Sequence, residues 1–249
     1  MTNIAICGAN GTMGKIIYNS ICERNDCTVT GGIDINTAPY ADFEIVASPF
    51  DLKIKPDVII DYSNPKSLDN LLAYGKMNGV ALVLSTTGFS DEQINQIKEA
   101  AEQIPVFFSF NMSLGINLLV SLAKKAAMVL GDLYDIEVVE KHHNKKVDAP
   151  SGTAIMLANA INEARDNKYK YMYDRHSQRQ SRSKTEIGIH SIRGGTIVGE
   201  HDIIFAGRDE VITLSHSAAS KQVFANGSIN AAVFIKDMPK GLYSMDDIV

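Results

Sequence analysis

The stretch "NIAICGANGTMGKIIYNSICER", residues 3–24, decides the fold, because it joins a short apolar run, three spaced glycines and a helical pattern. Gly8, Gly11 and Gly14 form G-x-x-G-x-x-G, a variant of the dinucleotide-binding fingerprint. Glycines let the backbone turn sharply and approach a pyrophosphate, and the helix that follows offers unpaired N–H groups with a partial positive charge. The stretch therefore predicts the first strand, phosphate-binding loop and first helix of a Rossmann-type domain.

An acidic residue at the end of the second predicted strand supports this interpretation. Asp34 lies twenty residues after Gly14 and can accept hydrogen bonds from the hydroxyl groups of an adenine ribose. Its neighbours Ile35 and Asn36 carry no positive charge that would offset the repulsion between Asp34 and a 2′-phosphate. We therefore expect NADH to be the preferred cofactor, with NADPH as the alternative.

The N-terminal part of the chain alternates strand and helix patterns. Apolar runs typical of strands buried on both faces occur at residues 3–7, 28–34, 57–61, 80–85 and 104–110. Residues 90–103 have helical spacing and begin with a capping box formed by Ser90 and Gln93. This alternation predicts an α/β fold with a doubly wound parallel sheet. Polar segments follow three of the strands, on the edge where such folds bind ligands, at residues 61–65, 85–88 and 109–117.

The pattern changes after the last of these strands. Residues 113–131 predict a helix with Leu118, Leu122 and Ala126 on one face. Further along, residues 165–184 form a polar stretch with seven Lys or Arg residues against two Asp. A solvated loop is the favoured interpretation of this stretch, and a lid that contacts ligand is the alternative.

Strand-like runs dominate residues 186–217, and a helical pattern returns at the C-terminus. We therefore expect two domains. Residues 1–112, completed by residues 221–249, would form the dinucleotide-binding domain. Residues 113–220 would form an α+β domain with an open mixed sheet, for substrate binding and oligomerisation. An open sheet leaves an edge or a face to be covered, so we expect a homo-oligomer.

Composition limits the classes of partner and compartment. The 249 residues carry a net charge of −5, which disfavours nucleic acid as a partner, because phosphate binding requires a basic face. Cys7, Cys22 and Cys27 have no metal-binding spacing and are interpreted as free thiols in a reducing compartment. The N-terminus does not have the pattern of a signal peptide, and no apolar run approaches the roughly 20 residues of a membrane helix. We expect a cytoplasmic protein without a membrane partner.

The segment "EKHHNKKVDAPSGTA", residues 140–154, concentrates proton carriers and anion binders. A histidine titrates near neutrality and can protonate a carbanion or enamine, and a lysine can hold a carboxylate. Residues 151–153, Ser-Gly-Thr, open a predicted helix whose N–H groups and hydroxyls can bind an anion. Taken alone, the His142–His143 pair also fits a hydrogen-bonded surface pair. Zinc is disfavoured, because adjacent histidines seldom share one metal and a third ligand is missing at typical spacing.

This segment resembles the signature E-x-H-H-x-x-K-x-D-A-P-S-G-T-A of the dihydrodipicolinate reductase family, also called the 4-hydroxy-tetrahydrodipicolinate reductase family. The resemblance extends along essentially the whole chain, through "GANGTMG", "DYSNP", "STTGF", "NMSLGIN", "IRGGTIVGEHDIIFAG" and "FANGSINAAVFI". It implies a tetrameric, nicotinamide-dependent reductase that reduces a cyclic imine dicarboxylate in the diaminopimelate route to lysine.

The resemblance also implies roles for single residues. His142 matches the catalytic proton donor, and Lys146 matches a second proton donor that contacts substrate. Three residues match positions that hold the substrate's carboxylates, with Ser151 beside them: His143, Gly152 and Thr153. The positions that match cofactor contacts are Gly8, Ala9, Asn10, Gly11, Thr12, Met13, Asp34, Ser85, Thr86, Thr87, Ser109, Phe110, Asn111 and Met112. No metal is implied.

The chain departs from the family pattern at two positions that affect the cofactor. Members that use NADPH well often carry a basic residue where this chain has Ile35, and some carry an arginine where it has Thr12. Both departures favour NADH. Two alternative functions stay open on the same architecture: an amino-acid dehydrogenase of the aspartate type, and a non-enzymatic module that senses NAD.

Overall fold

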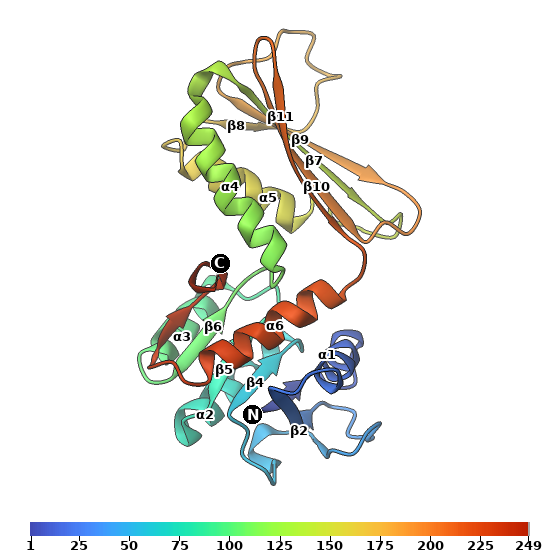
Figure 1. Ribbon diagram of the computed structural model, residues 1–249, viewed down its shortest axis with the longest axis vertical. Coiled ribbons are helices and arrows are strands. Elements are labelled where there is room, and N and C mark those ends of the chain that lie inside the picture. The colour runs from blue at the N-terminus through green and yellow to red at the C-terminus, as the bar shows by residue number, and fades with distance from the viewer. Residues whose placement is uncertain (249) are drawn as a thin grey trace. The chain divides into compact units, whose positions relative to one another are not determined.

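The glycine-rich stretch begins the first of two structural units in the computed structural model, which describes residues 1–248. Unit 1 comprises Met1–Leu114 and the segment from Lys221 onward, and unit 2 comprises Gly115–Ser220. In Figure 1 the blue N-terminal segment and the red C-terminal helix therefore belong to the same unit.

The described residues of unit 1 form a seven-stranded sheet in the order β12-β6-β5-β4-β1-β2-β3, with every neighbouring pair parallel. The strands are β1 (Thr2–Cys7), β2 (Cys27–Ile33), β3 (Ile45–Val46), β4 (Val58–Asp61), β5 (Ala81–Leu84), β6 (Pro105–Phe108) and β12 (Gly241–Tyr243). The helices are α1 (Thr12–Cys22), α2 (Leu68–Asn78), α3 (Asp91–Ala101) and α6 (Gln222–Ile235). The predicted doubly wound parallel sheet is confirmed.

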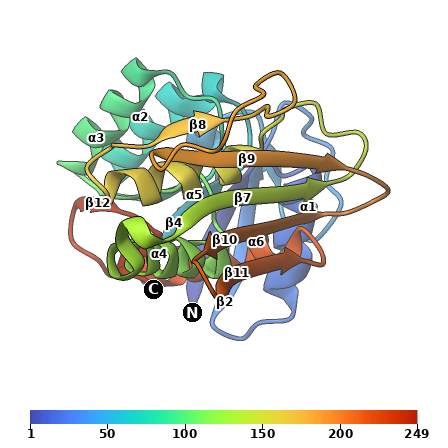
Figure 2. The ribbon, with the colours of Figure 1, turned by 90° about the horizontal axis from the view of Figure 1, so that it is seen from above.

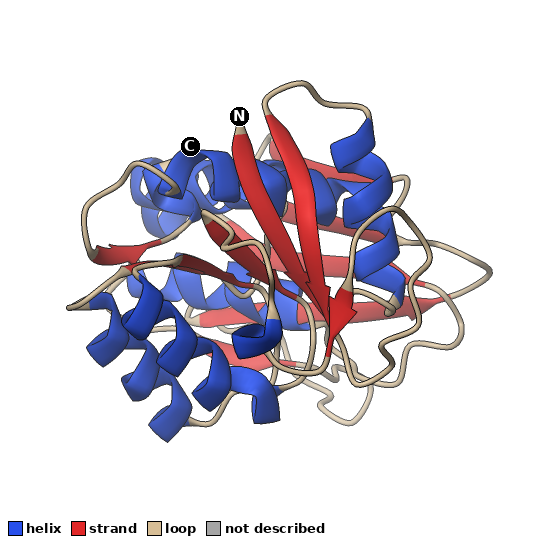
Figure 3. Cartoon of the chain, turned by 90° about the horizontal axis from the view of Figure 1, so that it is seen from below, coloured by secondary structure: helices blue, strands red, loops and turns tan. Residues whose placement is uncertain are grey.

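Both faces of this sheet are covered, which explains why its strands are apolar without alternation. Along β1, Ile4 and Ile6 belong to the core cluster that contains Ile17 of α1 and Ile229 of α6. Their neighbours, Ala5 among them, belong to the second cluster, which includes residues of α2 and α3. Figure 3 shows helices on both sides of these strands.

The described residues of unit 2 form a five-stranded mixed sheet in the order β11-β10-β7-β9-β8. Strand β7 pairs antiparallel with β10 and parallel with β9. The strands are β7 (Asp135–His142), β8 (Lys170–Met172), β9 (Glu186–Arg193), β10 (Gly199–Ala206) and β11 (Val211–Ala218). Helices α4 (Leu114–Leu130) and α5 (Gly152–Glu163) pack on one face of this sheet, as Figure 2 shows, and the open mixed sheet expected from sequence is confirmed. The chain also has short 3-10 turns at Pro49–Asp51, Pro65–Ser67, Gly131–Leu133 and Met245–Asp247.

Helix α4 differs from the sequence-based expectation in two ways. By length and composition alone, the segment Leu114–Leu133 is apolar enough to cross a membrane, a feature that the sequence analysis did not note and that a helix packed in a protein core can share. Leu118 and Leu122 do not face the core but are 48% and 44% exposed. The residues of α4 that pack in the core cluster with the sheet are Ile116, Leu119, Ala123 and Ala127. The buried stripe is therefore displaced from the predicted one, and packing on the sheet accounts for part of the helix's apolar composition.

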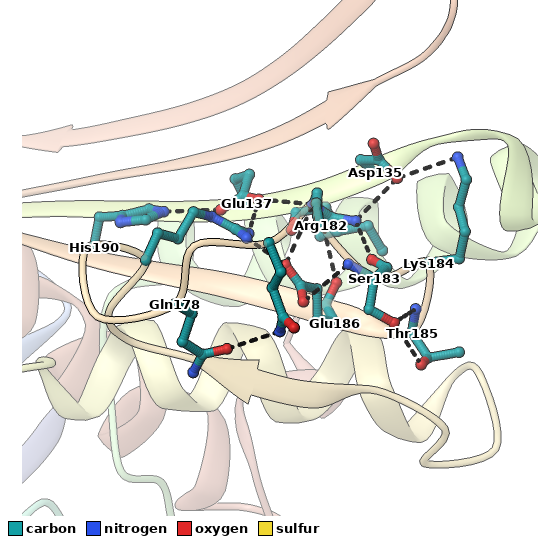
Figure 4. A network of polar contacts seen from close by, with 12 residues as sticks. Asp135, Glu137, Gln178, Arg182, Ser183, Lys184, Thr185, Glu186 and His190 are labelled. Carbon is teal, nitrogen blue, oxygen red and sulfur yellow. Dashed lines mark hydrogen bonds and ion pairs between the residues drawn. The ribbon is translucent and has the colours of Figure 1, made fainter.

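The basic stretch that precedes β9 is bound to the open face of the sheet (Figure 4). Its residues 173–181 are exposed. However, Arg182 donates to Glu137 at 2.9 Å, and Arg175 pairs with Glu137 at 2.9 Å and with Glu186 at 2.6 Å. The favoured interpretation of a solvated loop is therefore wrong for these two arginines, because carboxylates on β7 and β9 hold them against the sheet.

Candidate active site

The glycine loop leads from β1 into α1. Gly8 has a φ of +81°, and a Cβ atom there would lie 2.7 Å from the carbonyl oxygen of Tyr62, so only glycine fits. A Cβ atom at Gly14 would lie 2.3 Å from the carbonyl oxygen of Gly8, so this glycine lets the helix pack closely on the loop. Gly11 is the N-cap of α1 and provides no side-chain cap. The first N–H groups of α1 are therefore left for an anion such as a pyrophosphate.

Asp34 is held at the end of β2 by backbone N–H groups. Its Oδ2 accepts from the N–H of Asn10 at 2.9 Å, and its Oδ1 accepts from the N–H of Asn36 at 3.0 Å. The Asn10 side chain donates to the carbonyls of Asn36 and Ala38 at 2.6 and 3.1 Å, which ties the glycine loop to the loop after β2. The other loop residues predicted to contact cofactor are Ala9 (buried), Met13 (half-buried) and Thr12 (exposed).

The segment after β5 carries three further predicted cofactor contacts. Ser85 and Thr86 are buried and Thr87 is exposed. Asp61, at the end of the neighbouring strand β4, lies in the same region of the sheet edge. Burial raises the pKa of Asp61, although hydrogen bonds from the Ser63 hydroxyl and N–H oppose that shift. The sequence-predicted residues Ser85 and Thr86 therefore adjoin a buried acid at the carboxyl ends of the strands.

The segment after β6 is divided between exposed and core positions. Ser109 accepts from the N–H of Asn111 at 3.3 Å and donates to its carbonyl at 2.9 Å. Phe110 is 62% exposed, whereas Met112 is 2% exposed and belongs to the hydrophobic core. The Met112 side chain is thus occupied by packing, which leaves its backbone as the part that can contact a ligand.

In unit 2, the end of β7 brings Glu140 and His142 together. The His142 Nδ1 and the Glu140 Oε2 lie 2.6 Å apart. Arg193 donates to both oxygens of Glu140, at 2.8 and 2.7 Å, and the N–H of Ser151 donates to Oε1 at 3.1 Å. Burial alone would raise the pKa of Glu140, but hydrogen bonds from Arg193, Ser191, His142 and the Ser151 N–H outweigh it and lower the pKa to about 2. Glu140 is therefore a buried carboxylate.

His201 lies on the other side of this group. Its ring makes an edge contact with the His142 ring, with centroids 5.2 Å apart, and its Nε2 lies 3.0 Å from the Ser151 Oγ. Burial, followed by the charge of His142, lowers the pKa of His201 to about 4, so this ring is neutral near pH 7. The Ser151 Oγ also accepts from the N–H of Ala154 at 3.1 Å, as the N-cap of α5. The Ser151 hydroxyl thus fixes the start of the helix.

The remaining predicted substrate contacts surround that helix start. Gly152 is exposed, with no atom within 4 Å of the position of a Cβ atom, and Thr153 is half-buried. The Nδ1 of His143 is buried and has no hydrogen-bond partner among the described residues. The Lys146 Nζ lies 2.9 Å from Asp148 Oδ2, which lowers the pKa of Asp148. Gly152 thus leaves the N-terminus of α5 open, and the segment before this helix carries a lysine cation and a buried imidazole nitrogen. A group of His, Cys, Asp and Glu side chains able to hold a metal was not found among residues 1–248.

Several residues of these sites were missed by the sequence analysis. Glu140 lies within the quoted motif but was given no role. Arg193 and His201 lie in the quoted block "IRGGTIVGEH", which was the available signal. In unit 1, Ser228 of α6 is buried and lies 2.8 Å from the Tyr62 hydroxyl, within the quoted block "FANGSINAAVFI". Lys15 of α1, whose Nζ lies 5.5 Å from the centroid of the Tyr40 ring, was also overlooked.

Comparison with known proteins finds the same family in both halves of the chain. The family model for the N-terminus of dihydrodipicolinate reductase matches residues 2–112, and the model for its C-terminus matches residues 115–249. The 4-hydroxy-tetrahydrodipicolinate reductase of Caldanaerobacter subterraneus subsp. tengcongensis is 48% identical, over 100% of this chain and 98% of the relative. The enzyme of the same name from Clostridium tetani is 45% identical, over 99% and 96%.

A solved structure is similar over the same range. The dipicolinate-bound dihydrodipicolinate reductase from Paenisporosarcina sp. TG-14 is 28% identical, covers 100% of both chains and superposes with a TM-score of 0.81. The similarity thus includes the glycine loop in unit 1 and the His-His-Lys segment in unit 2.

Proposed function

Because this chain belongs to the dihydrodipicolinate reductase family, we propose how its two units divide the work of that family's reaction. The chain reduces 4-hydroxy-tetrahydrodipicolinate to tetrahydrodipicolinate in the diaminopimelate route of lysine biosynthesis. The substrate loses its hydroxyl group as water and gains one hydride and one proton. Membership in this family sets aside the aspartate-type dehydrogenase and the NAD-sensing module.

Unit 1 binds the nicotinamide cofactor, which supplies the hydride when bound. In our proposal the uncapped N-terminus of α1 binds the pyrophosphate, since Gly11 leaves its first N–H groups without a side-chain partner. The cofactor contacts would continue through residues 85–87 and 109–112, at the carboxyl ends of β5 and β6.

The position of Asp34 supports a preference for NADH. Backbone N–H groups aim both of its carboxylate oxygens, so an adenine-ribose diol could donate to them, whereas a 2′-phosphate would meet a negative charge. Lys15 is the feature that favours NADPH instead, because its Nζ lies 5.5 Å from the centroid of the Tyr40 ring, near the loop after β2. Ile35 is 99% exposed and adds no charge. We give Asp34 more weight than Lys15 in predicting the cofactor preference, because the Asp34 carboxylate is held in a fixed orientation.

Unit 2 would bind the substrate and supply the proton. His142 is the proposed proton donor, and Lys146 is the proposed second donor and substrate contact. His143, Gly152 and Thr153 would hold the substrate's carboxylates at the N-terminus of α5, where N–H groups and a partial positive charge favour anions. Ser151 would act indirectly, because its hydroxyl caps α5 and contacts His201.

The sheet of unit 2 supports an oligomerisation role as well. Its helices cover one face, and the other face remains open, with Ile192 46% exposed on β9. We propose a homotetramer assembled through these strands, in the cytoplasm. Light scattering after size-exclusion chromatography measures the oligomer number directly.

The observation that carries the proposal is the His142–Glu140 pair beside the α5 N-terminus, since it joins a proton carrier to an anion-binding site. The test is a coupled assay that makes the hydroxylated heterocycle in situ and follows nicotinamide absorbance with NADH and NADPH in parallel. We expect oxidation of both, with the higher kcat/KM for NADH. A higher kcat/KM with NADPH would mean that Lys15, and not Asp34, determines the cofactor preference. No oxidation of either cofactor would contradict the proposed division of work between the two units.

A further inference from the structure

We propose that Glu140, fixed by Arg193, is the positioning residue for the proton donor, and that it makes the Nε2 of His142 the atom that delivers the proton. This inference rests on the proposed role of His142. Glu140 does not touch substrate in this account, and its effect is exerted through the imidazole ring.

The first step of the argument is that the Glu140 carboxylate is fully occupied. Oε1 accepts from Arg193 and from the Ser151 N–H, and Oε2 accepts from Arg193 and lies against the His142 Nδ1. The Glu140 side chain is 0% exposed, so water does not compete for these sites. A second contact fixes the arginine, which donates to the carbonyl of Asp148 at 2.7 Å. The carboxylate is thus held in one orientation.

The second step fixes the tautomer of His142. An ionised carboxylate can only accept hydrogen bonds, so at 2.6 Å the His142 Nδ1 must be the donor. The proton available for transfer is then the one on Nε2. In the transfer, the Nε2–H bond breaks, a C–H bond forms at the substrate carbon, and the imidazolium becomes a neutral imidazole that keeps its proton on Nδ1. Glu140 gains no proton and holds the ring in place through Nδ1 during the transfer.

The third step concerns the space around Nε2. A Cβ atom at Gly199 would lie 3.1 Å from the His142 Nε2, which is closer than side-chain carbons normally come. Glycine at this position therefore keeps a side chain away from the donor atom. The neutral ring of His201 lies against the His142 ring, and being uncharged it does not repel the protonated donor. Glu140, Gly199 and His201 together leave Nε2 as the accessible atom.

The chain contains a matched control on the same strand. Glu137, on the other face of β7, accepts from Arg182 at 2.9 Å and lies 2.8 Å from the Nε2 of His190. Glu137 has the same charge as Glu140 and also contacts an arginine and a histidine, but it does not adjoin the N-terminus of α5. A Glu137→Gln variant therefore removes a comparable carboxylate while leaving the proposed donor untouched.

The experiment compares Glu140→Gln, Glu137→Gln and His142→Gln by kcat, KM, dipicolinate affinity from calorimetry and NMR of ¹⁵N-labelled histidine. We expect Glu140→Gln to lower kcat by roughly 10- to 100-fold, while KM and the dipicolinate affinity stay within about twofold. The His142 Nδ1 proton resonance, shifted downfield by a short hydrogen bond to a carboxylate, should move strongly in this variant and remain in Glu137→Gln.

The outcomes separate the inference from its premise. If His142→Gln loses activity while Glu140→Gln keeps the kcat and the Nδ1 resonance of the wild type, the positioning role is overturned and the donor role stands. If His142→Gln itself keeps near-normal turnover, the donor has been assigned wrongly. Should Glu140→Gln fail to fold, Arg193→Lys takes its place. It keeps the carboxylate but loses one of the two arginine contacts, and we expect a smaller loss of kcat with the same shift of the resonance. An unchanged kcat and resonance in folded Arg193→Lys would equally overturn the inference.

Discussion

Two groups of glutamate, histidine and arginine lie on opposite faces of the sheet around β7, with members from β7, β9 and the stretch before β9, and they differ in what surrounds them. The core-face group consists of Glu140, His142 and Arg193, and the open-face group consists of Glu137, His190 and Arg182. The two groups use the same side-chain chemistry at nearly the same distances. Residue types alone therefore do not tell a site from a structural network.

Burial and neighbours make the difference. The Glu140 side chain is 0% exposed and that of Glu137 is 21%, while the His142 and His190 side chains are 11% and 39% exposed. The core-face group adjoins the N-terminus of α5, an anion-binding feature, through the Ser151 N–H. The open-face group is covered instead by the basic stretch before β9 (Figure 4), and the missing side chain of Gly188 makes room for Glu137. In our proposal the core face carries the chemistry, whereas the open face holds the basic stretch in place.

The sharpest test of this contrast replaces each of the two histidines in turn by glutamine. We expect His142→Gln to lower kcat by about 100-fold or more, because a general acid contributes that much, and to leave dipicolinate affinity largely unchanged. His190→Gln should stay within about twofold of the wild-type kcat, since only the proposed donor acts on substrate. Steady-state kinetics of the two variants checks this, and an equal loss in both would remove the distinction between the faces.

Acid should weaken the core-face group in a defined pH range. The pKa of Glu140 is lowered from 4.5 to about 2, so its ionised form stabilises the folded state above pH 4.5 and that stabilisation is lost as pH falls towards 2. The contribution is on the order of 3 kcal/mol. The stability difference between wild type and Glu140→Gln, from urea unfolding, should therefore shrink between pH 5 and about pH 3. A difference that is constant over that range would contradict the assignment of Glu140 as a buried carboxylate.

A methyl group at Gly199 tests how closely the donor atom is surrounded. The Cβ atom of Gly199→Ala would lie 3.1 Å from the His142 Nε2, so the ring must shift or the methyl group must block the approach of substrate. We expect a loss of kcat of about tenfold, with cofactor affinity unchanged because the change lies in unit 2. Fluorescence titration with NADH and steady-state kinetics measure both quantities. Gly194→Ala is the control, since a Cβ atom there meets no atom within 4 Å.

The smallest effect on turnover is expected on the open face. Glu137→Gln leaves Arg182 and Arg175 with a weaker partner, and burial of these arginines is partial, so we expect the free energy of unfolding to fall by about 1–3 kcal/mol. Its kcat should stay within about twofold. Urea unfolding and steady-state kinetics, with the oligomer checked by light scattering, measure these effects. A large loss of kcat in an intact oligomer would mean that the open face also takes part in the chemistry.

Local sequence rules predicted the local structure well. Continuous apolar runs predicted the buried parallel strands, and the Ser90–Gln93 capping box is present at the start of α3. The same rules failed where tertiary packing decides which of two neighbouring stripes of a helix is buried. Leu118 and Leu122 share a helical face as predicted, but the core selected a neighbouring stripe of α4. The two-residue strand β3 is too short to carry a periodic signal.

The motif-based part of the candidate site followed from sequence because its residues are close together in the chain. His142, Lys146 and the Ser-Gly-Thr of α5 lie within one fifteen-residue segment. The partners that define its geometry do not: Arg193 is 53 residues from Glu140, and His201 is 50 residues from Ser151. The register of β7 with β9 brings Arg193 to Glu140, and the register of β7 with β10 brings His201 opposite Glu140, and a single sequence specifies neither register.

The measurement that tests the account most directly is an NMR titration of ¹⁵N-histidine-labelled wild-type protein with dipicolinate, with resonances assigned from His142→Gln and His190→Gln. The account predicts that the ring resonances of His142 on the core face move on binding, while those of His190 stay in place. Movement of His190 without movement of His142 would contradict the assignment of the substrate site to the core face of β7.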